Sequence, residues 1–348
     1  MNISKPLIDW YLAHKRDLPW RLTKNPYLIW LSEIILQQTR VAQGLPYYNA
    51  FVSAYPTIDM LANASEDEVL KLWQGLGYYS RARNLHATAK TITDNYGGQF
   101  PTTYTEVLAL KGIGSYTAAA ICSFSYNQPY AVLDGNVFRV LSRFFWIDTP
   151  INSSPAKKIF TEIAQQFLCK TTPDLYNQAI MELGATICTP TNPTCEACPL
   201  SDSCVANKKN DVTSFPIKLK KNKVKKRYFN YLVFQYQEQT VIEKRLEQDI
   251  WKGLYQFPLI ETELDVEGDE IISLIQQQYH LPDMTIVNVV KYPKHILSHQ
   301  HIFSTFLFVE LKNLKTLENH NWVDVKLLKR FPVSKNIDRF LNSYSVFS

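Results

Sequence analysis

Through roughly the first two hundred positions, apolar residues recur every three or four residues, the spacing that gathers them on one face of an α-helix. The pattern predicts helices over residues 30–42, 65–73, 116–124, 136–145, 155–170 and 175–187. Ser65 with Glu68 three residues later is a capping box, and Asp174 after Pro173 is expected to cap the helix that follows. This part of the chain is therefore predicted to be all-helical.

The pattern changes near residue 228, where short runs rich in β-branched and aromatic residues predict strands over 228–235, 285–290 and 302–311, with two helices between or beyond them. Nine Lys or Arg residues and one acid, Asp211, lie between Lys208 and Arg227. We interpret this run as a solvated linker, with phosphate binding as the alternative. The predicted domains are a helical one at 1–206, a basic linker at 207–227 and a smaller α+β one at 228–348.

Composition is that of a water-soluble protein with enough apolar residues for two cores: 348 residues, 46% hydrophobic, with a net charge of +5. The first twenty residues carry charges where a signal peptide needs an apolar run, and no uninterrupted apolar stretch reaches the length of a membrane span. Export and membrane insertion are not expected. We expect a cytoplasmic protein.

Four of the six cysteines follow the spacing Cys188-x6-Cys195-x2-Cys198-x5-Cys204. Four thiolates so close together are typical ligands of a 4Fe-4S cluster, and two disulfides or a structural zinc site are the alternatives. The other two, Cys122 and Cys169, lie in apolar stretches predicted as helical and are expected to be ordinary buried thiols.

Two glycines, Gly112 and Gly114, bracket an apolar residue just before the helix predicted from 116. Such a turn exposes backbone N–H groups at a helix N-terminus, where a phosphate binds readily, although many turns need glycine only for their geometry. About twenty residues later, Asp134 precedes another predicted helix, and an N-cap is its simplest interpretation.

These features occur together with three longer motifs: WLSEIILQQTR at 30–40, GLGYYSR at 75–81 and YNQAIMELG at 176–184. In this combination the chain resembles the adenine DNA glycosylases (MutY type) of the endonuclease III superfamily, strongly over about residues 5–205. The resemblance implies a helix-hairpin-helix at about 104–124, a cluster loop at 188–204 and base excision repair. Its implied reaction removes adenine opposite 8-oxoguanine, and opposite guanine, leaving an abasic site. The resemblance also implies that the protein binds duplex DNA with such mispairs and is a monomer. If the source is bacterial, it is expected at the nucleoid.

One position separates the subfamilies. Bifunctional relatives carry a nucleophilic lysine two residues past the second hairpin glycine, where this chain has Tyr116. Some members of the adenine glycosylase family also carry a lysine four residues after the aspartate, where this chain has Phe138. The resemblance therefore implies hydrolysis without strand cleavage. Two rival interpretations remain: an endonuclease III-like glycosylase/lyase for oxidised pyrimidines, and a non-catalytic mismatch-binding protein.

By resemblance, Glu33 protonates the adenine, and its apolar neighbours are expected to raise its pKa. Asp134 is expected to remain ionised and to stabilise the cationic sugar, with Asn136 beside it. The remaining carried-over positions are the adenine pocket residues Trp20, Arg21, Tyr116 and Gln178, the more weakly matched Arg16, the hairpin glycines Gly112 and Gly114, and Gln38 and Tyr78 as wedges at the opposing base.

Residues 228–348 resemble a Nudix-related domain that reads 8-oxoguanine, a match supported by WKGLYQFP at 251–258. A Nudix hydrolase needs a glutamate-rich helix to bind divalent metal, and residues 271–280 contain no glutamate, so binding is expected rather than hydrolysis. Ser298 and His299 are the candidates for contacting the damaged base, with an ordinary strand histidine as the alternative for His299. Leu297 stands where many relatives have phenylalanine and removes a stacking surface.

Overall fold

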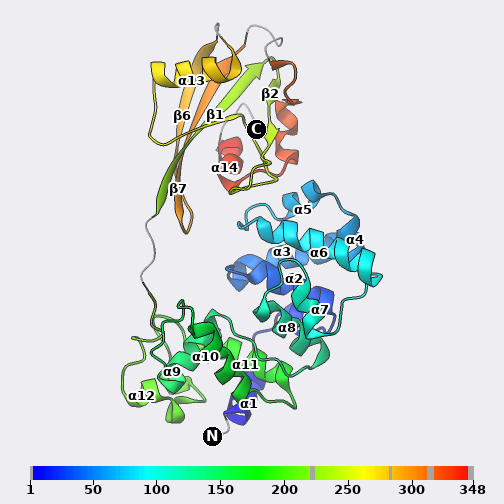
Figure 1. Cartoon of the computed structure of the whole chain (residues 1–348), viewed down its shortest axis with the longest axis vertical. Helices are drawn as coiled ribbons and strands as arrows, with labels where there is room; N and C mark the ends of the chain where they lie inside the picture. The colour runs from blue at the N-terminus through cyan, green and yellow to red at the C-terminus, as the bar shows by residue number, and fades with distance from the viewer. Residues whose placement is uncertain (1–2, 220–223, 282–283, 312–316, 344–348) are drawn as a thin grey trace. The chain divides into compact units, whose positions relative to one another are not determined.

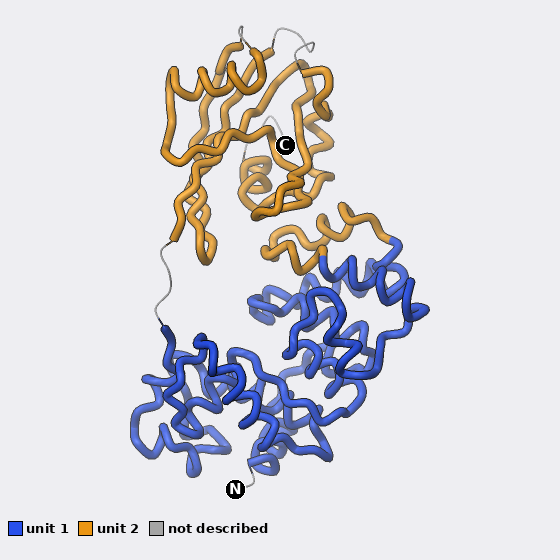
Figure 2. The backbone as a smooth tube through the Cα atoms, in the orientation of Figure 1, with its two compact units in different colours: residues 1–63, 84–220 blue, residues 64–83, 221–348 orange. Residues whose placement is uncertain are grey.

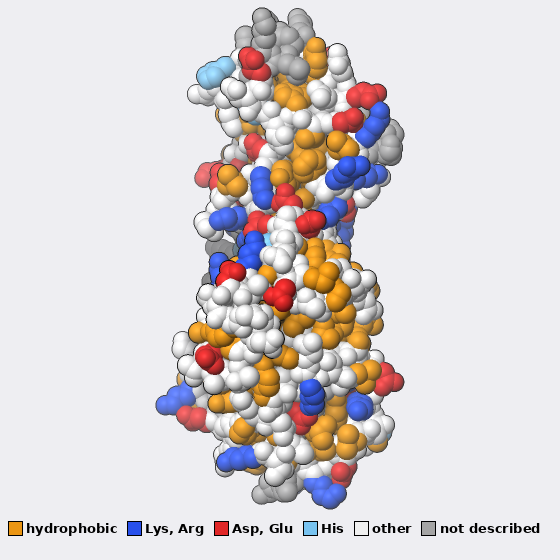
Figure 3. All heavy atoms as spheres, turned by 90° about the vertical axis from the view of Figure 1, so that its right-hand side faces the viewer, with side chains coloured by type: hydrophobic (Ala, Val, Ile, Leu, Met, Phe, Trp, Pro, Cys, Tyr) orange, Lys and Arg blue, Asp and Glu red, His pale blue; other side chains and the backbone are white. Residues whose placement is uncertain are grey.

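The computed structural model describes residues 3–219, 224–281, 284–311 and 317–343 (Figure 1). The chain forms two compact units (Figure 2). The first combines Met1–Asn63 with Asn84–Lys220, and the second combines Ala64–Arg83 with Lys221–Ser348. On the face drawn in Figure 3, acidic and basic side chains are interspersed within each unit. None of the helices in the described residues is long and apolar enough to cross a membrane.

The first unit is built from helices. Helix α11 packs against α1, α8 and α9, and α2 packs against α3 and α8, around large side chains such as Trp30, Phe51 and Phe160 that are fully buried. The helices are α1 (Ser4–His14), α2 (Pro26–Leu36), α3 (Val41–Ala54), α4 (Ile58–Asn63), α6 (Ser80–Tyr96, which crosses the boundary between the units), α7 (Tyr104–Ala109), α8 (Ser115–Tyr126), α9 (Gly135–Phe145), α10 (Ala156–Phe167), α11 (Pro173–Thr186) and α12 (Val205–Lys208), with 3-10 turns η1 (Pro19–Arg21), η2 (Cys195–Ala197) and η3 (Ser201–Ser203).

Two local expectations differ from the structure. The helix predicted over 30–42 is two helices, because α2 ends at Leu36 and Gln38 takes a left-handed backbone conformation (φ 55°) before α3 begins. Asp174 is not the cap of α11: Thr172 occupies that position, Pro173 is the first helical residue and Asp174 lies in the first turn.

The second unit has a mixed sheet with strand order β6-β7-β1-β2-β8, and β5 also pairs with β1. Strand β1 runs parallel to β7, and β6 runs antiparallel to β7. Alternate residues of β1 enter two cores, one completed by α14 and the other by α13, so this strand is apolar on both faces. The elements are α5 (Glu66–Leu72), β1 (Lys225–Tyr236), β2 (Gln239–Val241), β3 (Glu243–Lys244), β4 (Tyr255–Gln256), β5 (Leu259–Thr262), α13 (Asp269–Tyr279), β6 (Thr285–Ile296), β7 (Gln300–Glu310), β8 (Trp322–Asp324), η5 (Val325–Arg330) and α14 (Lys335–Ser343).

The boundary between the units differs from the expected linker. Residues 207–219 pack on the helical unit, since the Phe215 carbonyl accepts from Arg143 Nε (3.0 Å), the Ile217 carbonyl accepts from the Ile151 N–H (2.9 Å) and the Leu219 N–H donates to Asn152 (2.8 Å). Residues 64–83, in turn, pack with the C-terminal fold, and the predicted Ser65–Glu68 capping box at their start is confirmed. The first part of the predicted basic linker is thus bound to the helical unit through its uncharged residues at 215, 217 and 219.

The turn between α7 and α8 depends on one of its glycines. Gly112 has φ +78°, and a Cβ built on it would lie 2.7 Å from the Cβ of Asn84. Gly114, the N-cap of α8, has φ −95°, and a Cβ there would meet nothing within 4 Å. Only Gly112 is required by the backbone of the turn.

We therefore expect Gly112→Ala to lower the free energy of unfolding by about 1–3 kcal/mol, because alanine is strained in the left-handed region and would also collide with Asn84. Gly114→Ala is the matched control and should change stability much less. Urea unfolding of both variants checks this, and equal losses would contradict the steric explanation.

Candidate active site

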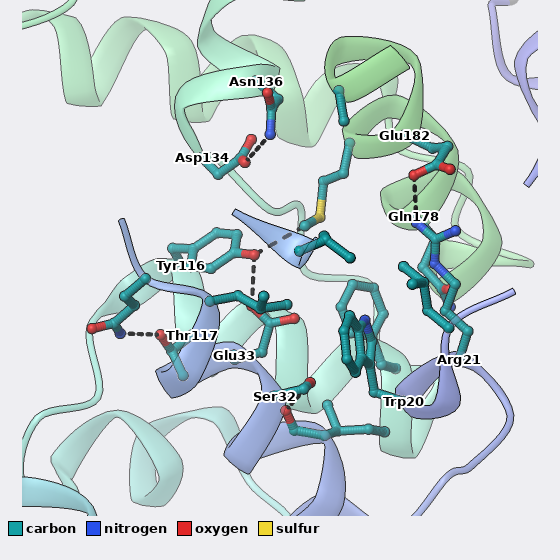
Figure 4. Close-up of a pocket in the computed structure, with 18 of the residues that line it drawn as sticks. Trp20, Arg21, Ser32, Glu33, Tyr116, Thr117, Asp134, Asn136, Gln178 and Glu182 are labelled. Carbon is teal, nitrogen blue, oxygen red and sulfur yellow. Dashed lines mark hydrogen bonds and ion pairs between the residues drawn. The ribbon is translucent and has the colours of Figure 1, made fainter. Parts of the chain in front are cut away.

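A cavity of about 640 Å³ opens within the helical unit (Figure 4). Its walls come from α2 and the turn that follows it, the start of α8, the start of α9 and one face of α11. The structure brings together at this cavity the predicted residues Trp20, Arg21, Glu33, Gln38, Gly114, Tyr116, Asp134, Asn136 and Gln178, as well as Arg16.

Glu33 projects from α2 into the cavity and is only 7% exposed. Its Oε2 accepts a hydrogen bond from the Tyr116 hydroxyl at 2.6 Å. Burial raises the pKa of Glu33 to about 7, the nearby negative charge of Asp134 adds to that rise, and the hydrogen bond from Tyr116 opposes it. Burial and the same carboxylates hold the pKa of Tyr116 well above its usual value. Glu33 can therefore carry a proton near neutral pH.

Asp134 is the N-cap of α9, so the simplest interpretation from sequence is confirmed. Its Oδ1 accepts from the Val137 N–H at 2.8 Å, and its Oδ2 accepts from the Asn136 amide at 2.7 Å. Burial raises the pKa of Asp134, whereas these hydrogen bonds and the positive charge of Arg139 oppose the rise. Capping orients the carboxylate at the cavity wall, so the structural role and a chemical role are compatible.

Glu182 is a cavity residue that sequence reasoning missed. It is 1% exposed and forms ion pairs with Arg16 (2.7 Å) and Arg21 (2.6 Å). Although burial works to raise its pKa, the hydrogen bonds from the two arginines lower it to about 2. Gln178, one turn earlier on α11, accepts a hydrogen bond from the Tyr11 hydroxyl at 2.7 Å. The four-residue spacing from Gln178 was the available signal, because it puts both side chains on one helix face.

The remaining predicted contacts lie in the second unit. The Tyr78 hydroxyl donates to Ser298 Oγ (3.3 Å), and Ser298 Oγ lies 3.1 Å from His299 Nδ1. His299 is exposed in the connection between β6 and β7, so the alternative of a strand histidine is wrong. Tyr78 is 47% exposed, and Leu297 packs at the edge of one core of the sheet.

Cys188, Cys195, Cys198 and Cys204 line one small cavity together with Arg143. Arg143 Nη1 lies 3.3 Å from Cys188 Sγ, and the same guanidinium donates to the carbonyls of Thr189 and Pro190. None of the six cysteines forms a disulfide. Within the described residues, no group of three or more His, Cys, Asp or Glu side chains is placed to hold a metal ion. Four thiols that line one cavity beside a guanidinium form a candidate ligand set.

The expectation for the other two cysteines holds for one of them. Cys122 is buried within α8. Cys169 lies beyond the end of α10, is partly exposed, and has its sulfur 3.3 Å and 3.2 Å from the hydroxyls of Thr171 and Thr172. These contacts lower the pKa of Cys169 even though burial opposes them. Apolar neighbours in sequence misled the prediction because the helix stops at Phe167.

Comparison with known proteins relates both units to established families. Residues 31–166 match the HhH-GPD superfamily of base excision DNA repair proteins, and residues 230–343 match the NUDIX domain. Among solved structures, a thermostable thymine-DNA glycosylase is 28% identical with a TM-score of 0.55, covering 59% of this chain and 95% of that one. An endonuclease III in a DNA complex shares the fold at 20% identity and a TM-score of 0.51, covering 60% of this chain and 96% of that one.

Curated relatives named adenine DNA glycosylase extend over both units. One from Buchnera aphidicola subsp. Baizongia pistaciae is 36% identical over 90% of this chain and 88% of its own length. Another, from Buchnera aphidicola subsp. Schizaphis graminum, is 33% identical over 98% of both chains. The rat protein of that name is 43% identical over 58% of this chain and 41% of its own length. The resemblance drawn from the motifs is thus confirmed, and this chain belongs to the adenine DNA glycosylase family of the HhH-GPD superfamily.

Proposed function

We propose that this protein binds duplex DNA and hydrolyses the N-glycosidic bond of adenine paired with 8-oxoguanine, or with guanine, leaving an abasic site and an intact strand. The observation that carries the proposal is the pair of carboxyl groups in one cavity: Glu33, whose burial raises its pKa to about 7, and Asp134, whose oxygens accept two hydrogen bonds. One is suited to hold a proton and the other to hold a charge.

In the proposed reaction, Glu33 donates its proton to ring nitrogen N7 of adenine, and the glycosidic electron pair leaves with the neutral base. Positive charge then develops on the sugar, and the Asp134 carboxylate stabilises it across the cavity. A water molecule adds to the anomeric carbon and returns a proton to Glu33. General acid catalysis of this kind contributes ~10²- to 10⁴-fold, and Tyr116 keeps the Glu33 carboxyl oriented.

The adenine pocket is proposed to lie between Trp20, Gln178 and the Glu182 ion-pair network. The amide of Gln178 can pair with the edge of adenine through both a donor and an acceptor, and the Tyr11 contact fixes its orientation. Arg16 and Arg21 are held by Glu182, so their positions are set before the base arrives. Trp20 offers an apolar face, and its ring makes an edge contact with Tyr48.

Water is the proposed nucleophile because Tyr116 occupies the hairpin position of the lysine in bifunctional relatives. Its hydroxyl is engaged by Glu33, and its pKa lies well above the usual value, so it is a poor nucleophile. Two lysines line the cavity, and neither occupies the hairpin position: Lys24 is paired with Asp174 at 2.5 Å, and Lys157 lies in the first turn of α10. Strand cleavage is therefore not part of the proposed reaction.

Adenine must leave the duplex to reach this cavity, and unstacking it costs a few kcal/mol, least at a mismatch. Gln38 and Tyr78, both with left-handed backbone conformations, are proposed to occupy the space around the opposing base. Ser298 and His299 are proposed to contact 8-oxoguanine. The C-terminal domain then acts by binding, since the acids of α13 are confined to Asp269 and Glu270 at its start.

The four cysteines are proposed to hold a 4Fe-4S cluster, which supplies a rigid, electron-rich centre for the loop at 188–204. Arg143 would offset its negative charge, because the guanidinium already contacts Cys188 Sγ and three carbonyls around the loop. A structural role in DNA binding is favoured over redox chemistry. We further propose that the protein acts as a monomer, at the nucleoid if the source is bacterial.

The deciding experiment is a single-turnover assay on a duplex with one 8-oxoguanine:adenine pair, scored for breaks with and without hot alkali. Breaks that require alkali are expected. Breaks without alkali would point to a lyase, with Lys157 as its candidate amine, and no breaks at all would favour the mismatch-binding protein.

Asp134→Asn should bind the mispair tightly yet lose most base removal, and full activity in that variant would contradict the electrostatic role.

The rate of base removal should fall as the pH rises through about 7, because the proposed acid must be protonated and its pKa lies near that value. A raised carboxyl pKa also means that the folded state binds more protons than the unfolded one, so Glu33 lowers stability increasingly from about pH 4.5 to 7. Glu33→Gln should therefore abolish activity while stabilising the protein at pH 8 more than at pH 5. Rate profiles and urea unfolding at both pH values check this.

Purified protein should contain iron and acid-labile sulfide in equal amounts, and Cys198→Ser should lose both together with DNA affinity. Cys169→Ser is the matched control and should retain them, because Cys169 lies outside the cysteine cavity. Metal analysis decides the point. Stoichiometric zinc without sulfide would instead support the zinc alternative.

A further inference from the structure

A short loop that carries Tyr78 has an unusual backbone. Gly75, Gly77 and Tyr78 all have positive φ angles, of 99°, 76° and 48°. The left-handed region is open to glycine but costs a tyrosine of order 1 kcal/mol, and such conformations persist where the surroundings enforce them. The contacts that hold this loop therefore determine where the Tyr78 ring lies.

The residues that flank the loop both bind the backbone of one residue of the C-terminal fold, Val333. Before the loop, Gln74 Oε1 accepts from the Val333 N–H at 3.2 Å. After the loop, the Tyr79 hydroxyl donates to the Val333 carbonyl at 3.4 Å and accepts from the Gly75 N–H at 3.2 Å. Val333 itself is buried in a core of the sheet, so the loop is attached to a rigid part of the second unit.

Gln74 makes a second attachment through the other end of its amide. Its Nε2 donates to Asp338 Oδ1 at 2.8 Å, in the first turn of α14, and Lys71 donates both to Gln74 Oε1 and to the Phe331 carbonyl at 3.2 Å. A glutamine uses donor and acceptor at once in this arrangement, which fixes its orientation. Gln74 is half-buried and does not line the cavity.

We infer that Gln74 is a positioning residue for Tyr78: by tying the loop to Val333 and Asp338, it keeps Tyr78 beside Ser298 and so sets how strongly the enzyme prefers 8-oxoguanine to guanine opposite adenine. The inference rests on the proposed function, because it gives Tyr78 and Ser298 their roles at the opposing base. A second polar contact attaches the segment 64–83 at Asp67, seven residues before Gln74, where Lys244 and Tyr255 both donate to the Asp67 carboxylate. That contact docks the segment but is remote from the loop.

The test compares single-turnover efficiencies on 8-oxoguanine:adenine and guanine:adenine duplexes. Gln74→Glu loses only the donor to Asp338 and should lower the ratio of the two about fivefold, the effect of one ordinary hydrogen bond. Gln74→Ala loses every hydrogen bond of the amide and should lower the ratio at least as much. Combining Gln74→Glu with Asp338→Asn reverses donor and acceptor while conserving charge, and should restore most of the ratio. Failure of this reciprocal pair to restore it, or an unchanged ratio in Gln74→Ala, would overturn the inference.

Two control variants separate positioning from general loosening. Lys326→Met removes an exposed ion pair with Glu238 (2.7 Å) in the same unit and should leave the ratio unchanged. Asp67→Ala removes the upstream contact with both Lys244 and Tyr255, and it should change the ratio much less than Gln74→Ala does. An equal change would mean that Gln74 merely docks the segment.

Amide hydrogen exchange over residues 75–79 supplies a readout that is independent of activity. Exchange should be faster in Gln74→Ala than in wild type and should return to the wild-type rate in the reciprocal pair. If wild type removes no adenine, the proposed function fails on its own. If Gln74→Ala removes adenine but its exchange over residues 75–79 is unchanged, the positioning role of Gln74 fails and the proposed function stands.

Discussion

The burial of one carboxyl group beneath a tyrosine hydroxyl is the constraint around which the helical unit is arranged. Helices α2 and α8 pack closely enough to remove Glu33 from water while keeping it at the cavity wall. Desolvation then raises its pKa to about 7, and the hydrogen bond from Tyr116 prevents the neutral acid from turning away. Without this packing, Glu33 would be an ordinary carboxylate that is ionised at neutral pH.

The other two carboxyl groups of the cavity have different partners from Glu33, and their pKa values respond differently to burial. Glu182 is as deeply buried as Glu33, yet it faces two arginines and stays ionised, with its pKa lowered to about 2. Asp134 accepts two hydrogen bonds, and the positive charge of Arg139 also acts on it. One cavity thus contains a carboxyl whose pKa burial raises to about 7, one whose pKa two arginines lower to about 2, and a third, Asp134, whose hydrogen bonds oppose the rise in pKa that burial causes.

The second unit shows that the order of residues along the chain is a poor guide to which residues pack together. In sequence, residues 64–83 lie between two segments of the helical unit. Their polar contacts, however, go to residues near 244, 255 and 331–338. Tyr78 and Ser298 meet for this reason. The loop that carries Tyr78 and the connection that carries Ser298 are therefore parts of one folded unit.

Local patterns in the sequence determined part of the fold and several site residues: helices that correspond to α2, α8, α9, α10 and α11 in the first unit, α5 and the strands β1, β6 and β7 in the second, the capping box at Ser65 and the cap at Asp134. They did so because periodicity and capping depend on residues a few positions apart. The motif order also determined the family, and the cysteine spacing the candidate cluster ligands. The break in the helix after Leu36 was missed, although four consecutive polar residues at 37–40 interrupt the apolar pattern there.

Only the tertiary structure decided which side chains share an environment. Glu33 meets Tyr116 across 83 positions, and Arg16 meets Glu182 across 166, so neither the raised pKa nor the ion-pair network is visible in any local pattern. The attachment of residues 64–83 to the C-terminal fold was equally hidden. Burial and pairing depend on packing between distant segments, and it is these, rather than residue identity, that shift the pKa values of Glu33 and Glu182 in opposite directions.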